Sequence, residues 1–269
     1  TEINYIKKIV DSFDGTQFGD PNLVNDDIFA IFPLIKAGYD SSDEMIQKDI
    51  AFIISKQNVD GSWESVDMTA SAIQALSLLP ISENITKAKT QAEQYLKNVQ
   101  KSDGGFENSF STSWVIQAIN SLHEDMLAWT KNNLNTINYL ASLQQSDGGV
   151  ELLTADKNTR IWATSYAITA VGGKSWADIM QSFTKPTVNT VGDNVNKKNI
   201  NFVKTTNVEK PKNLEFTENQ KPEIVTVNNL GASAGDIDIS LKSVVHKASL
   251  PFIYIGKGFL NIVNFMFGF

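Results

Sequence analysis

The chain carries few side chains suited to covalent catalysis or to metal binding. Its 269 residues include no cysteine, which excludes disulfides, thiolate metal sites and a thiol nucleophile. The two histidines, His123 and His246, do not lie at metal-ligand spacing from a second strong ligand. Asp26-Asp27 is more typical of a helix N-terminus than of a magnesium site, and Gly256-Lys257-Gly258 is too short for a phosphate-binding loop. We therefore expect no metal and no cofactor.

Side chains that could bind an apolar ligand are better represented, and they recur at helical spacing. Phe110, Trp114 and Gln117, for example, are four and three residues apart, which places them on one face of a helix. A mixed aromatic and polar face on an otherwise buried helix is typical of a cavity lining, because buried amides need partners. The alternative is that the rings simply fill the centre of a small helical array. The predicted ligand-binding residues are Phe29, Ser71, Gln74, Phe110, Trp114, Gln117, Trp162 and Tyr166, and the same faces carry Asn25, Phe32, Asp67 and Thr169.

These faces belong to a repeated unit marked by an Asp-Gly step. The step occurs at Asp14, Asp60, Asp103 and Asp147, at spacings of 46, 43 and 44 residues. Each step follows one helix-like run and precedes another, and its glycine supplies the left-handed conformation that ends the first helix. Units of this length stack and bury a shared core through their neighbours. The predicted helix pairs are 2–12 with 24–37, 43–57 with 66–79, 84–101 with 110–122, and 130–145 with 160–172.

The second helices of the pairs share one apolar frame. The segment that begins at Thr69 lies over the segment that begins at Thr112, and those at Asp27 and Thr164 fit the same frame. We therefore expect the four second helices to point to one centre. The composition around them is acidic, with a net charge of -7, which argues against nucleic acid as a partner.

Three of the turns read as a Gln-rich helix end followed by Asp-Gly, namely Gln57 to Trp63, Gln100 to Phe106 and, less fully, Gln144 to Val150. This pattern resembles the repeats of the terpenoid cyclase and protein prenyltransferase superfamily. The resemblance covers roughly residues 1–180 and implies an all-α fold, an α/α toroid whose second helices line a central cavity. A full toroid in that family has six pairs, whereas this sequence offers about four. The ring would then be open, short, or completed by a partner or by the C-terminal region.

The resemblance also draws attention to Asp67. Squalene-hopene-type cyclases protonate an alkene with an Asp-x-Asp-Asp-Thr-Ala motif, whose middle Asp is the acid. Here the sequence is Ser65 to Ala70, in which Asp67 and the Thr-Ala match while Ser65 and Met68 replace the flanking acids. The alternative role of Asp67 is that of an acidic residue at a helix N-terminus. The zinc site of the prenyltransferases, built from Asp, Cys and His, cannot form in a chain without cysteine.

Beyond the repeats the composition changes. Residues 181–249 contain Pro186, Pro211 and Pro222 and show no helical period, which predicts a polar linker or a few short strands docked on the helices.

Residues 250–269 are strongly apolar and are predicted to form a helix with Lys257, Asn261 and Asn264 on one stripe. Such a helix suits contact with a membrane surface or with a second copy of the chain. The alternative is that it docks on the core of its own chain.

Three functional hypotheses follow. The first is a non-catalytic, toroid-like helical repeat domain that binds an apolar, isoprenoid-like ligand or a protein partner, with possible membrane contact through 250–269. The second is a divergent terpenoid cyclase that uses Asp67 as its acid, and the third is a structural assembly module that oligomerises. The start at Thr1, without a signal-peptide pattern, fits either a removed leader or a shortened chain, and an exported or membrane-associated location is favoured over the cytoplasm.

Overall fold

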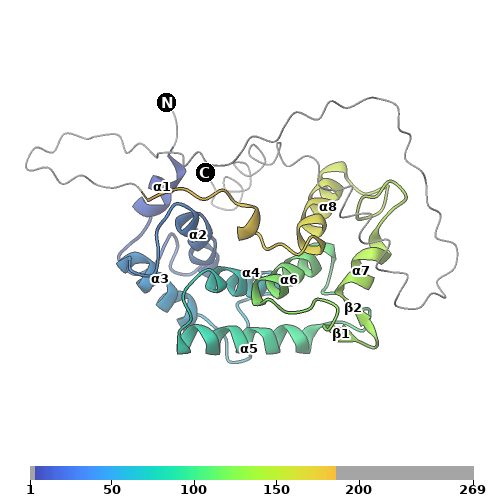
Figure 1. Cartoon of the computed structure of the whole chain (residues 1–269), viewed down its shortest axis with the longest axis horizontal. Coiled ribbons are helices and arrows are strands. Elements are labelled where there is room, and N and C mark those ends of the chain that lie inside the picture. The colour runs from blue at the N-terminus through green and yellow to red at the C-terminus, as the bar shows by residue number, and fades with distance from the viewer. Residues whose placement is uncertain (1–3, 186–269) are drawn as a thin grey trace, which may run out of the picture. The chain divides into compact units, whose positions relative to one another are not determined.

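The computed structural model describes residues 4–185, which are helical for most of their length and belong to one compact unit (Figure 1). They form eight α-helices, one short β-hairpin and a 3₁₀-helix, so the all-α prediction is confirmed for this part of the chain. The helices are α1 (Tyr5–Asp11), α2 (Val24–Lys36), α3 (Glu44–Ser55), α4 (Val66–Ser77), α5 (Glu83–Val99), α6 (Ser109–Leu122), α7 (Thr136–Leu143) and α8 (Lys157–Val171); the strands are β1 (Thr130–Lys131) and β2 (Leu134–Asn135), and the 3₁₀-helix is η1 (Ala177–Ile179).

Several predictions fall outside these residues. They concern nearly all of the predicted linker at 181–249 and the whole apolar segment at 250–269, with Lys257, Asn261 and Asn264. His246 and the Gly256–Gly258 triplet also lie outside the described residues.

The helices form four consecutive pairs, as the repeat predicts, with one correction in the fourth pair. The predicted helix at 130–145 begins only at Thr136, because Asn132 and Asn133 adopt positive φ angles of 51° and 62° and turn the chain into the β1–β2 hairpin. Two asparagines in succession favour that turn. The side chain of Asn135 then caps α7 reciprocally with Asn138.

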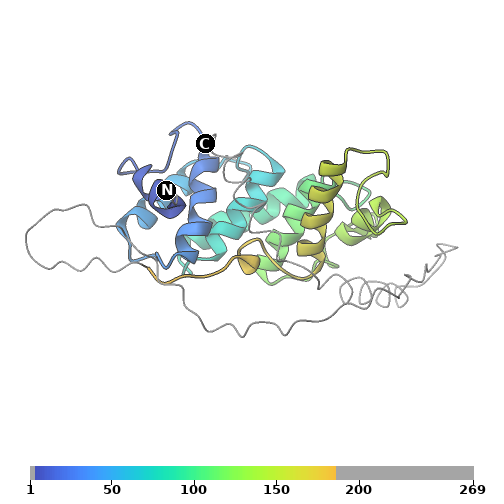
Figure 2. The same ribbon diagram turned by 90° about the horizontal axis from the view of Figure 1, so that it is seen from above.

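The second helices of the pairs lie next to one another in the order α2, α4, α6, α8 (Figures 1 and 2). The most extensive helix packing joins α4 to α6 and α6 to α8. The first helices cover one side of this row, with α5 packed against α4 and α7 against α6. Consequently α4 and α6 are buried on almost every side, while α1 has no buried residue.

A shared turn ties each unit together. In every unit the Asp of the Asp-Gly step accepts a hydrogen bond from the backbone N–H two residues later, at 2.7 Å from Asp14 and 3.0 Å from Asp60, Asp103 and Asp147. The following glycine has a positive φ, from 83° to 103°. This combination of an Asp-based turn and a left-handed glycine is the reason that the step recurs.

The frame that aligns the second helices is visible in the hydrogen bonds. The hydroxyls of Thr69, Thr112 and Thr164 each accept a hydrogen bond at 2.9 Å. The donor in each case is the backbone N–H of a residue that follows the Asp-Gly turn. In the first unit the carboxyl group of Asp27 accepts the N–H of Phe18 at 2.7 Å instead. The predicted equivalence of these four positions is therefore confirmed.

After α8 the chain crosses back to the first unit. We call residues 172–185 the return segment; it contains η1 and is the gold trace in Figure 1. The Phe183 N–H donates to the carbonyl oxygen of Lys36 at 2.6 Å, and Lys185 forms an ion pair with Asp43. The Lys185 ammonium also lies 4.9 Å from the ring centre of Tyr39. The last unit is thus tied to the first through the chain itself.

Candidate functional site

The inner face of the helix row is the side of α2, α4, α6 and α8 opposite the Thr and Asp residues that bind the turns. Aromatic rings form a continuous series along it. Trp114 on α6 lies 6.0 Å from Phe29 on α2 and 5.7 Å from Tyr166 on α8, between ring centres. Tyr166 in turn lies 5.9 Å from Phe110 and 6.0 Å from Trp162. The structure therefore brings together the aromatic residues predicted from three different units.

Trp176 of the return segment is wedged into the middle of this series. Its ring centre lies 5.4 Å from Phe29, 5.1 Å from Phe32 and 5.5 Å from Trp114. Its backbone N–H donates to the side-chain oxygen of Gln74 at 3.0 Å. Phe29, Gln74 and Trp114 are therefore buried beneath the chain's own tryptophan, and this half of the inner face is filled. Trp176 lies beyond the helical frame, so the repeat gave no signal for it.

The polar side chains of the inner face differ in whether they have hydrogen-bond partners. Ser71 donates to the backbone oxygen of Asp67 at 2.8 Å, and the Gln74 amide donates to the oxygen of Trp114 at 3.4 Å. Gln117, the equivalent of Gln74 one unit later, is 1% exposed, and neither its amide nitrogen nor its amide oxygen has a partner. A buried amide without partners is costly and is a natural contact for a ligand or a water molecule.

The other half of the inner face is open at its rim. Asp67, Phe110 and Trp162 occupy equivalent positions in the aligned frame, in the first turns of α4 and α6 and in the second turn of α8. Trp162 is 37% exposed, and Phe110 and Tyr166 are partly exposed. An exposed tryptophan beside other accessible rings is a common feature of binding surfaces.

Asp67 supplies the charge at this rim. Burial raises the pKa of its carboxyl group, a hydrogen bond from Ser111 opposes the rise, and the charge of Glu107 adds to it. Its Oδ1 atom is buried without a hydrogen-bond partner. Within residues 4–185 no ion pair involves Asp67. Burial and the nearby Asp67 charge also raise the pKa of Tyr166 to about 12, so its hydroxyl stays protonated at neutral pH.

Asp67 is not the cap of its helix. The N-cap of α4 is Ser65, whose hydroxyl accepts the Met68 N–H at 3.2 Å, and Asp67 follows in the first turn. Asp67 is thus an acidic residue at a helix N-terminus, as its alternative role predicts, while the cap itself is Ser65. Its position near the positive end of the helix dipole still favours its charged form.

Two other acids form a pair that the sequence analysis missed. Asp27 on α2 and Asp49 on α3 are both fully buried, and burial raises the pKa of each, that of Asp49 well above its usual value. Their carboxyl groups influence each other's pKa, and neither oxygen of Asp49 has a hydrogen-bond partner among the described residues. The sequence did carry a signal for Asp49, because it lies on an otherwise apolar stripe of its helix, at the position that Ala92 occupies in the next unit. We did not predict its burial, since an isolated acid in a helix is rarely buried.

In residues 4–185 no three or more His, Cys, Asp and Glu side chains lie close enough to hold a metal ion. No helix of this range combines the length and apolarity that crossing a bilayer requires. Comparison with protein-family models and with curated proteins finds no match for this chain.

Proposed function

We propose that this chain is a non-catalytic binding module whose inner face takes an apolar ligand that carries a cationic group. The observation that carries the proposal is Asp67, a partly buried carboxyl group with an unpartnered oxygen beside three accessible aromatic rings. The predicted resemblance to a toroid, and the binding of an isoprenoid-like ligand or of a protein side chain, belong to the same proposal. A protein partner would meet the rim with a lysine or arginine side chain.

The chemistry of the rim favours an organic cation over an anion. A cation within about 6 Å of a Trp, Tyr or Phe ring is attracted by the negative face of the ring, by roughly 0.5–2 kcal/mol. Asp67 would supply the counter-charge, and within the described residues it has no ion-pair partner of its own to displace. An anion would instead meet the negative charges of Asp67 and Glu107.

The apolar part of the ligand would lie along the rings at the rim, because Trp176 already covers Trp114 deeper in the inner face. Trp114 lies behind the rim, and Gln117 is one helical turn further along α6. The unpartnered amide of Gln117 could bond a polar atom of the ligand or an intervening water. A membrane contact through 250–269 stays a prediction, because that segment lies outside the described residues.

A direct test is titration of the full chain with dodecyltrimethylammonium below its micelle concentration, followed by calorimetry. Dodecyl sulfate and neutral dodecyl maltoside serve as charge controls. We expect saturable binding of the cation that exceeds binding of both controls, and a loss of about 2- to 30-fold in affinity for Trp162→Ala. Leu127→Ala, which removes a side chain that is 50% exposed elsewhere, should leave the affinity unchanged. Equal binding of all three detergents, or no effect of Trp162→Ala, would contradict the proposal.

A further inference from the structure

The helix α8 ends the row of second helices and exposes a face that is buried in its neighbours. In α4 and α6 one stripe contacts the following unit, and we call it the next-unit face. On α4 it includes Ser77, which accepts a hydrogen bond from Lys89 of α5 at 3.3 Å. On α6 it includes Ser109, which bonds to Glu151, and Asn120, whose amide donates to the Ala170 oxygen at 2.9 Å.

The same stripe on α8 is open. Val66, Ala70 and Ile73 of α4 are at most 6% exposed, and Ser109, Ser113 and Ile116 of α6 are fully buried. Their equivalents on α8 are Ile161, which is 52% exposed, Ser165, which is exposed, and Ile168, which is half-buried. The fourth unit therefore keeps the side chains of a packed interface but leaves them more exposed than their equivalents in α4 and α6.

Within residues 4–185, the turn of the fourth unit also lacks a hydrogen bond that the second and third turns make to the following unit. The Gln57 amide donates to Gly61 of its own turn and, at 2.9 Å, to Ala88 of the next unit. Gln100 does the same with Gly104 and Trp129. Among the described residues the Gln144 amide nitrogen donates only to the Gly148 oxygen, at 3.1 Å.

The glycines of the Asp-Gly turns show the same difference between the fourth unit and the units before it. A Cβ added to Gly61 or Gly104 would overlap the backbone of the following unit, at Gln91 and Asn135. One added to Gly148 would find no described atom within 4 Å.

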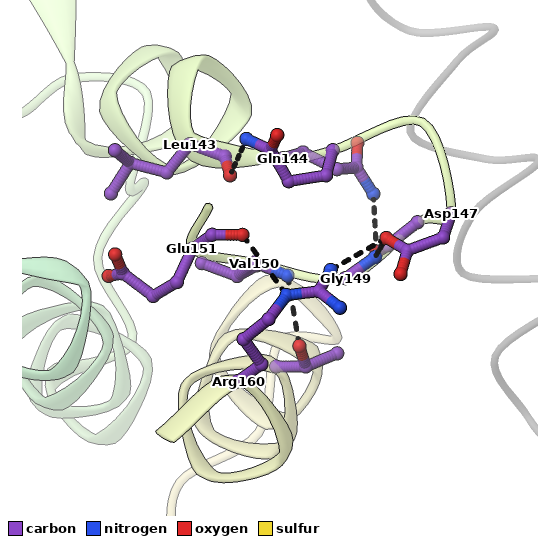
Figure 3. Close-up of polar contacts among 10 residues, drawn as sticks. Leu143, Gln144, Asp147, Gly149, Val150, Glu151 and Arg160 are labelled. Atoms are coloured by element: carbon purple, nitrogen blue, oxygen red, sulfur yellow. Dashed lines mark hydrogen bonds and ion pairs between the residues drawn. The ribbon is translucent and has the colours of Figure 1, made fainter. Parts of the chain in front are cut away.

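A groove of about 460 Å³ lies along this open face, lined by Leu153, Ala155, Ile161 and Ser165 among others. Arg160 borders the groove, but its guanidinium already has partners. It donates to the carboxylate of Asp147 at 2.7 Å and to the backbone oxygen of Glu151 at 3.2 Å (Figure 3). Apolar residues thus supply most of the unpartnered surface, which is typical of a helix-docking face.

We propose that a second copy of this chain covers the groove, with the two α8 helices packed antiparallel about a two-fold axis. The stripe is self-complementary, because Ser165 is flanked by Ile161 on one side and Ile168 on the other. An axis near Ser165 brings Ile161 of each copy against Ile168 of the other, and the small serine permits close approach. A head-to-tail contact has no equivalent open face, because α2 of the first unit is buried along most of its length.

The hydroxyl of Ser165 does not oppose burial in such an interface. It donates to the Ile161 oxygen within its own helix at 2.7 Å. Ser113 makes the same bond to Ser109 at 2.7 Å in α6, where it is fully buried against its neighbours. In the antiparallel arrangement Lys157 at the start of α8 also approaches the C-terminal end of the partner α8, where the helix dipole favours a cation.

The test uses sedimentation velocity on the full chain. We expect a reversible dimer, which Ser165→Lys shifts to monomer because it places two like charges at the axis. Ser55→Lys is the matched control, since Ser55 is also an exposed helical serine bonded within its helix, to Phe52 at 2.7 Å. It should leave the dimer intact. Circular dichroism of both variants should match that of the parent chain, because both positions are exposed in one copy.

The absence of cysteine permits a second measurement. Ser165→Cys should give a covalent dimer with a short bis-maleimide linker, whereas Ser55→Cys should not. A parent chain that stays monomeric at every concentration would overturn the inference. So would a dimer that persists in Ser165→Lys, since that result would place the contact elsewhere, for instance at another surface or at 250–269.

Discussion

At the scale of single residues, the buried pair of Asp27 and Asp49 links folding to pH. Asp27 accepts the Phe18 N–H, whereas neither oxygen of Asp49 has a hydrogen-bond partner among the described residues, and the two acids cannot both be charged at no cost. The raised pKa values mean that the folded pair retains a proton above the ordinary Asp pKa of 3.8. The unfolded chain releases that proton, so the free energy of unfolding falls as the pH rises through the folded pKa values.

We therefore expect Asp49→Asn to stabilise the fold at pH 8 by about 1–3 kcal/mol, because the amide can donate to Asp27 without a charge to desolvate. Well below pH 3.8 the advantage should vanish, since both acids are then protonated in the folded and unfolded chains. Urea unfolding at several pH values measures the difference. A gain that is the same at every pH would mean that the pair shares no proton.

Asp67 yields a pH-dependent prediction for binding. Its raised pKa means that the charged form is lost at a higher pH than for an ordinary Asp. Affinity for dodecyltrimethylammonium should therefore decline as the pH falls through the folded pKa of Asp67. Asp67→Asn should bind more weakly at pH 8 and show little of this dependence. An unaltered pH profile in the variant would separate Asp67 from the binding site.

The same residue allows a test of the cyclase hypothesis. Alkene protonation needs a strong acid, whereas burial makes Asp67 a weaker proton donor, and the flanking acids of the motif are absent. We expect no cyclised product when the chain is incubated with squalene or polyprenyl substrates. Turnover that Asp67→Asn abolishes would refute this expectation.

At the scale of the helix pair, Gly104 and Gly148 have the same φ of 83° but different surroundings. An alanine at Gly148 should cost only the left-handed backbone strain, about 1–2 kcal/mol. Gly104→Ala should cost several kcal/mol more, because its methyl group would overlap Asn135. Urea unfolding of the two variants provides the comparison. Equal losses would indicate that the third and fourth units are not closely packed at this turn.

The pairs were predictable because each follows from local chemistry. The Asp-Gly turn, the Thr69-type hydrogen bond and the apolar frame all recur at a fixed spacing, so helix order and most helix ends could be predicted. The hairpin before α7 was not predicted, since Asn132 and Asn133 read as part of a continuing helix.

The candidate site was predictable only in part. Helical spacing identified the aromatic rings from Phe29 to Tyr166, but it could not indicate that Trp176 fills the space between them. That contact joins residues far apart in sequence and follows no period. The Asp27–Asp49 pair was missed for a different reason, because each acid alone resembles an ordinary surface residue even though Asp49 lies on an apolar stripe of α3.

At the scale of the whole described fold, the return segment connects the fourth unit with the first. Trp176→Ala should lower the free energy of unfolding by about 3–5 kcal/mol, because it empties a site among Phe29, Phe32 and Trp114. Trp162→Ala should cost much less, since that ring is partly exposed. Similar losses in the two variants, measured by urea unfolding, would show that Trp176 does not hold the segment in place.

The two anchors of the return segment also determine how the fold would bear mechanical tension. A pull transmitted through the backbone beyond Lys185 reaches the fold beside Tyr39 and Asp43, in the first unit, rather than at α8. The Lys185–Asp43 ion pair and the Phe183–Lys36 hydrogen bond would carry the load first. While they hold, the force passes from the first unit into the continuing chain, and the third and fourth units, with their binding rim and open groove, are shielded from it.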